Sequence, residues 1–169
     1  MFKVSTFDAI LPEGLAAPDI GWTGFVGDFV PDAVFGFVGQ NPIKTSILML
    51  LFTDVACEPA QLRPEHNGDR RGWVGDGFGI DATRGEQPLG STLWLLRRSV
   101  LNEQVAFEAE AECVRALQPL VRQGIATSVL ATARINGARD RLELAITLKA
   151  RDGRPVFADQ FDVLWKRVN

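Results

Sequence analysis

Acidic side chains and a single histidine lie in residues 55–90, a stretch of the chain that is rich in glycine and proline. The candidates for chemistry among them are Glu58, Glu65, His66, Asp69 and Asp76. A glycoside hydrolase needs two carboxyl groups that flank a sugar cleft, one of them with a raised pKa so that it can donate a proton. A serine or cysteine hydrolase needs the histidine as the base of its nucleophile. Residue types alone therefore allow two kinds of hydrolytic chemistry.

The residues around these groups support neither mechanism. The chain has no Gly-x-Ser-x-Gly elbow for a serine nucleophile, and His66 is expected to be a solvated loop residue. Arg70 and Arg71 stand beside the carboxylates and should keep them ionised, which is wrong for a general acid. We therefore predict no catalytic residues and no enzyme activity, with a lysozyme-like peptidoglycan hydrolase as the alternative function.

Phosphate, metal and cofactor sites are equally hard to build from these residues. Gly75-Asp76-Gly77-Phe78-Gly79 is glycine-rich but lacks the lysine and the flanking strand and helix of a phosphate-binding loop. The two cysteines, Cys57 and Cys113, stand far apart and outside any Cys-x-x-Cys motif. We predict no cofactor and no metal, and we interpret the cysteines as small buried hydrophobic residues in a reducing compartment.

A protein interface is the better interpretation of the loop Asp69-Arg70-Arg71-Gly72-Trp73-Val74-Gly75-Asp76. Arginine offers paired donors to a carboxylate, and tryptophan supplies a large apolar anchor. The loop could lock itself through internal Arg–Asp pairs, or it could present its Arg and Trp side chains to a partner, and residue types favour the two equally. The predicted interface residues are Asp69, Arg70, Arg71, Gly72, Trp73 and Asp76.

Charge and hydropathy exclude two classes of partner. The chain has 18 basic and 21 acidic residues, a net charge of -3 and no long basic run, so no nucleic-acid partner is expected. The longest apolar run, residues 47–52, is far shorter than the roughly 20 residues that span a bilayer. The N-terminus lacks the apolar segment of a signal peptide. We expect no membrane partner and a chain that is soluble and cytoplasmic when made.

The elements that position the loop divide into an N-terminal arm, residues 1–40, and a domain, residues 41–169. The arm is rich in glycine, proline and phenylalanine, and short strands are expected at Gly24-Phe25-Val26 and Ala33-Val34-Phe35. Such an arm packs on the outside of the domain, reaches to a neighbouring molecule, or forms an irregular edge of the same core, and the sequence leaves these three open.

Two of the expected helices flank the loop. Asn41-Pro42 begins the first, because Asn caps free amides and Pro is tolerated at the first helical position, and the helix continues to about Asp54. It is apolar nearly all round, so it should be deeply buried. Ser91 caps a short helix from Thr92 to about Arg98. The segment 55–90 between them is a loop, and loops of this length are usually functional.

A third, long helix is expected from Asn102 to Gln123. Its apolar stripe is Phe107, Val114, Leu117 and Val121, widened by Ala106, Ala109, Cys113, Ala116 and Leu120. Pro119 should kink the helix or restart it near Gln118, because proline removes an amide and clashes with the preceding turn. Gly124 suits the left-handed position that ends a helix.

The C-terminal third predicts a three-stranded antiparallel meander. The first strand runs from Ile125 to Ile135, the second alternates apolar and polar residues through 141–149, and the third runs from about Pro155 to Trp165. Asp152-Gly153 marks the second hairpin. In the second strand the apolar set is Leu142, Leu144, Ile146 and Leu148; in the third it is Phe157, Phe161 and Val163. The fold class is therefore α+β, with helices packed on the meander and the long helix covering one face.

Three segments of this chain together resemble one phage protein family. They are Leu51-Phe52-Thr53-Asp54, the loop from Asp69 to Asp76, and Gly90-Ser91-Thr92-Leu93-Trp94-Leu95-Leu96. The later matches are Ala116-Leu117, Gly124, Arg141-Leu142-Glu143-Leu144, Asp152-Gly153 and Leu164-Trp165. Over roughly residues 28–165 the chain resembles the Mu-type phage tail proteins named after gene forty-six of that phage. Val55-Ala56-Cys57-Glu58 and Pro119 depart from the pattern.

The resemblance implies a baseplate wedge subunit of a contractile tail, related to the gene-twenty-five-type wedge proteins and to the equivalent subunit of type VI secretion. It implies other baseplate wedge proteins, the tail tube or hub, and the tail sheath as partners, with the sheath beginning to polymerise on strands of this subunit. It matches Arg70, Arg71 and Trp73 to an acidic and Arg-containing loop that contacts the wedge core. The implied location is the tail baseplate of the virion, assembled in the host cytoplasm.

Overall fold

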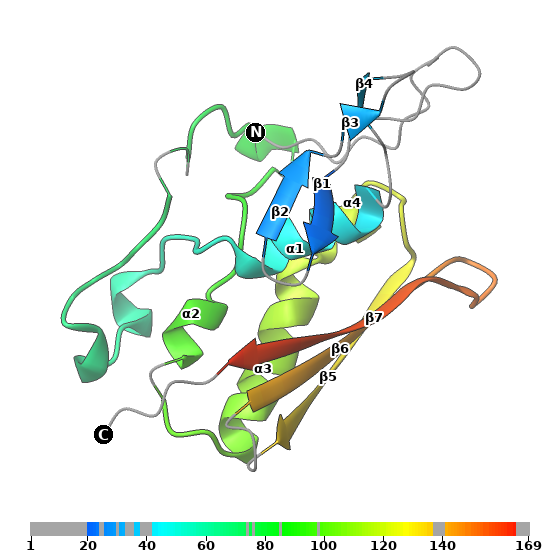
Figure 1. Ribbon diagram of the computed structural model, residues 1–169. Coiled ribbons are helices and arrows are strands. Elements are labelled where there is room, and N and C mark those ends of the chain that lie inside the picture. Colours follow the sequence, from blue (N-terminus) through cyan, green and yellow to red (C-terminus); the bar gives the residue numbers. More distant parts are fainter. Residues whose placement is uncertain are drawn as a thin grey trace.

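The computed structural model describes residues 42–73, 75, 77–84, 86–97, 99–136 and 141–164, with Pro42 and Leu164 as backbone only, and the backbone of four short strands before them (Figure 1). These strands form two antiparallel pairs, β1 (Ile20–Thr23) with β2 (Val26–Phe29) and β3 (Pro31–Asp32) with β4 (Gly36–Phe37). Of the strands expected in the arm, Val26 begins β2, whereas Gly24-Phe25 and Ala33-Val34-Phe35 lie outside the described residues.

The predicted meander is confirmed. Strands β5 (Ser128–Asn136), β6 (Arg141–Lys149) and β7 (Pro155–Leu164) form one antiparallel sheet in the order β5-β6-β7. The four apolar residues of β6 are all buried, as their alternation predicts, and Phe157 of β7 lies in the same core. Gly153 has the positive φ of 81° that the second turn requires.

The first strand starts three residues later than expected. The amides of Ile125 and Ala126 both donate to the carbonyl of Leu120, at 3.0 and 3.3 Å, so these residues finish the preceding helix instead of joining the sheet. Gly124, with φ 75°, makes this turn possible, as predicted. Trp165, the expected end of the third strand, lies outside the described residues.

The long helix is broken where proline requires it. Helix α3 (Glu103–Ala116) ends before Leu117, and α4 (Gln118–Arg122) starts with Pro119 in its first turn. Asn102 caps α3, because its side-chain oxygen accepts the Val105 amide at 2.9 Å. Helix α3 lies across the sheet on the β5 side (Figure 1), which confirms the expected packing.

The expected stripe on α3 was wrong at Phe107, whose side chain is 65% exposed. The buried face is centred on the smaller residues that the prediction treated as its margin. They are Ala106, Ala109, Cys113 and Ala116, continued by Leu117 and Leu120. Small side chains let the helix approach the sheet closely, and this rotates Phe107 out of the core.

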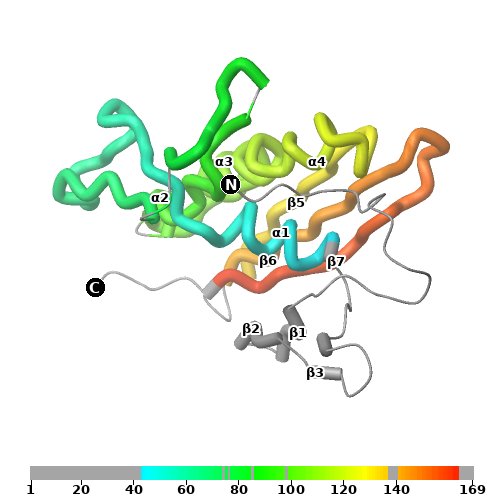
Figure 2. Tube along the Cα trace, turned by 90° about the horizontal axis from the view of Figure 1, so that it is seen from above, coloured from blue at the N-terminus to red at the C-terminus, as the bar shows by residue number. Residues whose placement is uncertain are grey.

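Helix α1 (Pro42–Phe52) covers the β7 side of the same sheet face, two residues shorter than predicted (Figure 2). Lys44 ties it to the strand through Asp159, with 2.8 Å between Nζ and Oδ2. Ile47 and Leu51 are buried, whereas the last residue, Phe52, is 42% exposed and packs edge-on against Phe161. The helix is therefore buried on one side and not all round.

The segment between α1 and α3 contains little regular structure, as expected. Three short 3-10 turns, η1 (Pro59–Gln61), η2 (Pro64–His66) and η3 (Ala82–Arg84), precede α2 (Leu93–Leu96). Beneath this segment Cys57, Trp94 and Leu95 form a small core of their own. In the described part of the chain no helix is long and apolar enough to cross a membrane.

Candidate interaction site

Two of the segments that carry the family resemblance, residues 51–54 and 90–96, lie side by side at the end of α1. The amide of Ser91 donates to the carbonyl of Thr53 at 2.9 Å, and the amide of Val55 donates to the carbonyl of Ser91 at 3.1 Å, which makes a short parallel bridge. Gly90 allows this approach: its φ is 123°, and a Cβ there would stand 2.3 Å from the Thr53 carbonyl oxygen. The bridge thus joins the residues that follow α1 to the residues that precede α2.

Ser91 acts below this bridge as a buried linker. Its hydroxyl donates to the carbonyl of Leu51 and accepts the amide of Leu93 at 3.2 Å, so one side chain joins the end of α1 to the start of α2. The expectation that Ser91 caps this helix was wrong: α2 is four residues long and starts at Leu93, its N-cap is Thr92, and the Thr92 side chain makes no capping hydrogen bond.

Arg70 is bound to the backbone of Cys57, a short distance along the chain from this bridge. Its Nε donates to the carbonyl of Cys57 at 2.8 Å, and the Cys57 amide donates to the Arg70 carbonyl at 3.1 Å. This exchange holds the predicted interface loop against residues 55–57. Arg70 nevertheless remains exposed at the surface.

Arg71 makes the central contacts of the site. Its Nη1 lies 2.6 Å from Oδ2 of Asp54, its Nε lies 3.4 Å from Oδ2 of Asp69, and its backbone amide donates to Oδ1 of Asp69 at 2.9 Å. Its guanidinium carbon stands 4.8 Å from the centre of the Trp94 ring, which is cation–π distance. The hydrogen bond to Asp54, followed by the charges of both carboxylates and opposed by burial, raises the pKa of Arg71 above its ordinary value.

The backbone of Arg71 is also unusual, with a φ of 50°. A left-handed conformation is disfavoured for a residue with a Cβ, so the side-chain contacts of Arg71 must outweigh that cost. Gly72 follows with a φ of 101°, which turns the chain sharply toward Trp73. The self-locking arrangement that residue types allowed is therefore present.

Trp94 and His66 support the loop from below. Trp94 is buried and donates from Nε1 to the Val55 carbonyl at 2.9 Å. The expectation of a solvated His66 was wrong, since this side chain is 1% exposed and packs edge-on against Trp94 at 5.8 Å between ring centres. Nδ1 accepts the Arg63 amide at 2.9 Å, so Nε2 carries the proton and donates to the Leu95 carbonyl at 2.9 Å.

Trp73 lies apart from this network and covers Gly75. A Cβ at Gly75 would stand 2.1 Å from the Trp73 ring, so only glycine fits beneath it. Among the described residues no hydrogen-bond partner is present for the buried Nε1 of Trp73. Asp76, the last predicted interface residue, lies outside the described residues.

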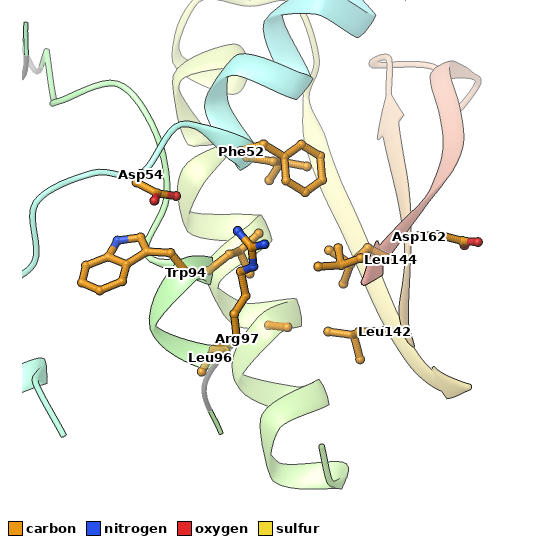
Figure 3. Close-up of a pocket in the computed structure, with 12 residues that line it drawn as sticks. Phe52, Asp54, Trp94, Leu96, Arg97, Leu142, Leu144 and Asp162 are labelled. Carbon is orange, nitrogen blue, oxygen red and sulfur yellow. The ribbon is translucent and has the colours of Figure 1, made fainter. Parts of the chain in front are cut away.

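A pocket of about 210 Å³ opens beside Asp54 and Trp94, between the end of α1, α2, α3 and the sheet (Figure 3). Its lining is mainly apolar, with Leu51, Leu93, Leu96, Leu142, Leu144 and Val163 among the residues that form it. Figure 3 shows Arg97 extending from α2 toward the end of α1, and Asp162 pointing away, where it pairs with Arg141 at 3.0 Å. The pocket therefore offers apolar surface next to the Arg71 network.

Asp69 and the two cysteines, which the sequence offered for catalysis or metal binding, lie in other environments. Both oxygens of Asp69 are engaged by Arg71. Cys57 and Cys113 are buried, as predicted, and burial, followed by the charges of Glu112 and Glu110, raises the pKa of the Cys113 thiol to about 12. In the described ranges no cluster of three or more acidic, histidine or cysteine side chains is placed to hold a metal ion.

Loop composition alone missed Asp54, His66 and Trp94 as parts of the site. Asp54 and Trp94 lie far in sequence from Arg71, whereas His66 belongs to the same loop region but was expected to be solvated. Arg71 stacks on Trp94 instead of on its near neighbour Trp73. A signal was present, because Asp54 and Trp94 belong to the segments that carry the family resemblance. The three resembling segments thus converge on one side chain, that of Arg71.

Comparison with known proteins gives two matches. Residues 43–155 match the model of the family described as "Phage protein GP46". The chain is also 29% identical over 108 residues to the baseplate protein gp46 of Escherichia phage Mu, and the match covers 64% of this chain and 70% of that protein. The family match contains every residue of the Arg71 network.

Proposed function

We propose, from the premise that this chain belongs to the phage protein GP46 family, that it is a structural subunit of a contractile-tail baseplate. Its finer role in this proposal is that of a wedge subunit, which links the inner baseplate proteins and the tail tube or hub to the first ring of sheath. The observation that carries the proposal is the convergence of three segments within the family match on the side chain of Arg71.

The interface in this proposal is the loop that contains Asp69, Arg70, Arg71, Gly72, Trp73 and Asp76. Arg71 acts mainly inside the subunit, because its guanidinium already contacts Asp54, Asp69 and Trp94. These contacts fix the loop before a partner binds, so less conformational entropy is lost on binding. Arg70 uses only Nε in hydrogen bonds of the described residues, so its terminal nitrogens remain available to a carboxylate of a neighbouring baseplate protein.

The sheet supplies the second contact in this proposal. Strands β5 and β7 are its two edges, and an edge strand has backbone amides and carbonyls that accept a strand from another chain. The tail sheath is the partner that we assign to this contact. The subunit would be assembled in the host cytoplasm and would reside in the tail baseplate of the virion, without contacts to nucleic acid or membrane.

A non-enzymatic role is part of the proposal. A peptidoglycan hydrolase would need two carboxyl groups that face the sugar, whereas both oxygens of Asp69 contact Arg71. No observation on the described residues favours the hydrolase alternative over the structural role.

The interface role is tested with the double variant Arg71→Ala, Trp73→Ala. We expect it to be absent from assembled baseplates, measured by purifying tail particles and probing them for the subunit. Circular dichroism and thermal unfolding of the isolated chain should show that it is still folded.

Two control variants distinguish the internal contacts that hold the loop from the contact of the loop with a partner protein. Arg151→Ala changes an exposed arginine in the β6–β7 turn and should leave assembly intact. Asp54→Asn weakens the hold on Arg71 without removing any proposed contact, so it should reduce incorporation less than the double variant does. Normal incorporation of the double variant would refute the interface.

A further inference from the structure

The two edges of the sheet differ in how their outward amides are held. The Ala133 amide donates to Oε1 of Glu110 at 2.7 Å, so it faces away from β6. Backbone groups that point toward and away from the neighbouring strand alternate along an antiparallel strand. The backbone amides of Val129, Ala131 and Ile135 therefore point away from β6, like that of Ala133. On β7 the corresponding outward amide is that of Gln160, which donates to Oδ1 of Asp159 at 2.8 Å. Each edge therefore has one amide covered by a carboxylate.

The carboxylate at β7 has a cation as its partner, whereas the one at β5 has none among the described residues. Asp159 receives Lys44 of α1 at 2.8 Å, so the charge at this edge is balanced within the subunit. Glu110 lies on α3 and makes no ion pair with any described residue. An incoming strand that takes the Ala133 amide would displace Glu110, and the carboxylate would then need a new donor.

Apolar surface lies next to the same edge. Phe107 is one helical turn before Glu110 on α3 and is 65% exposed, and Ile135 is two residues after Ala133 on β5 and is also exposed. Helix α3 and strand β5 run in opposite directions (Figure 1). Phe107, which precedes Glu110, and Ile135, which follows Ala133, therefore lie on the same side of the Glu110–Ala133 contact. The apolar row on α3 continues through Ala111 to the half-buried Val114. A strand added to β5 would cover this surface.

We propose that the β5 edge, and not the β7 edge, receives an extended strand from a partner protein, which carries a lysine or arginine opposite Glu110 and an apolar side chain over Phe107 and Ile135. The inference rests on the sheet contact of the proposed function and assigns it to one edge and one partner chemistry. Until the partner arrives, Glu110 protects the edge, because a buried or inward-pointing charge discourages pairing between identical edges. A strand that carries the cation then pairs with Glu110, and this ion pair stabilises its binding over that of a strand without one.

The test uses the full chain, labelled with ¹⁵N, and two synthetic peptides of about the length of β5, nine residues. Both alternate valine and threonine, and they differ only in a central Lys or Glu. Amide hydrogen exchange is measured by nuclear magnetic resonance during titration. The Lys peptide should slow exchange at Ala131, Ala133 and Ile135, leave Ala158 and Asp162 unchanged, and bind about fivefold more tightly than the Glu peptide.

Variants identify the group that discriminates between the peptides. Glu110→Gln keeps a hydrogen-bond acceptor but removes the charge, so the Lys and Glu peptides should then bind equally. Asp159→Asn, the matched change at the other edge, should leave the preference intact. Slowed exchange at Ala158 and Asp162, no saturable binding of the Lys peptide, or an unchanged preference in Glu110→Gln would overturn the proposal. So would protection of β5 by the chain alone at high concentration, which would identify a second copy as the occupant.

A crosslinking experiment separates this inference from the proposed function. The photoreactive residue p-benzoylphenylalanine replaces Ile135 in one variant and Ala158 in another, and assembled tail particles are irradiated. Crosslinks to another protein from position 135 alone are expected. Incorporation into baseplates with crosslinks from position 158 alone contradicts only the choice of edge, whereas absence of the unmodified chain from baseplates contradicts the proposed function itself.

Discussion

The sheet with α3 and the segment 53–97 are stabilised by different kinds of interaction. The sheet side buries a periodic set of aliphatic side chains, and any one of them is one contribution among many. The segment 53–97 has a small core of three residues, and single polar contacts from Arg71, Ser91, His66 and Trp94 hold it in place. Stability in the first region should follow buried volume, and in the second it should follow the geometry of individual bonds.

The largest effect is expected in the sheet. Leu144→Ala removes a side chain that is 0% exposed at the centre of β6, and it should lower the free energy of unfolding by about 2–5 kcal/mol because a cavity remains. Denaturation by urea measures the change. Leu130→Ala, at a side chain that is 52% exposed on β5, should cost less than about 1 kcal/mol. If both variants lost a similar free energy of unfolding, the stability of this region would not depend on buried volume.

The second effect tests geometry in the segment 53–97. Gly90→Ala places a Cβ 2.3 Å from the Thr53 carbonyl oxygen at a φ of 123°, so the bridge to Ser91 must open. We expect a loss of about 2–4 kcal/mol, with faster amide exchange at Val55 and Ser91. Gly124→Ala also has a positive φ, 75°, but no atom within 4 Å, and should cost only about 1 kcal/mol. An equal cost at both glycines would show that close approach is unimportant.

A pH experiment examines the link between the two regions. Glu112 on α3 accepts the Thr92 amide and pairs with Arg115. Burial raises the pKa of Glu112, but these partners lower it more, and the net result is a pKa below the ordinary 4.5. Its stabilisation is therefore complete above pH 4.5 and is lost as the pH falls toward the folded-state pKa.

The matching variant is Glu112→Gln, which should reduce stability at pH 7 by about 1 kcal/mol and flatten the loss of stability below pH 4.5. Glu58→Gln, at an exposed residue, should leave the slope unchanged. Urea denaturation at a series of pH values measures both. An unaltered acid slope in Glu112→Gln would mean that the link between α2 and α3 does not depend on this charge.

The smallest effect is expected at the ion pair of Arg71 and Asp54. Both side chains are about one-third exposed, so Asp54→Asn should cost only about 0.5 kcal/mol, and high salt should reduce the difference. Amide exchange at Cys57, whose partner is the Arg70 carbonyl, should nevertheless become faster. If exchange there is unchanged, Arg71 does not hold the loop.

Prediction from sequence succeeded where neighbouring residues decide the structure. The break of the long helix before Pro119, the turn at Gly124 and the alternation in β6 were all confirmed, because proline, glycine and a two-residue period act within a few positions. It failed at Phe107 and His66, which ended in opposite environments from those expected. Their burial depends on which side of α3 meets the sheet and on the fit of an imidazole under Trp94, and both are long-range properties.

By itself, then, the sequence determined the α+β class, the meander, the helix break before Pro119 with the turn at Gly124, and the resemblance to the phage protein GP46 family that the family match confirms. Only the tertiary structure decided that Arg71 contacts Asp54 and Trp94, and that Glu110 covers the edge of β5 while Asp159 and Lys44 cover that of β7. The reason is physical. Local conformational preferences are properties of short segments, whereas a charged side chain takes its partner from whichever distant residues the packing of helices and strands brings within a few ångströms.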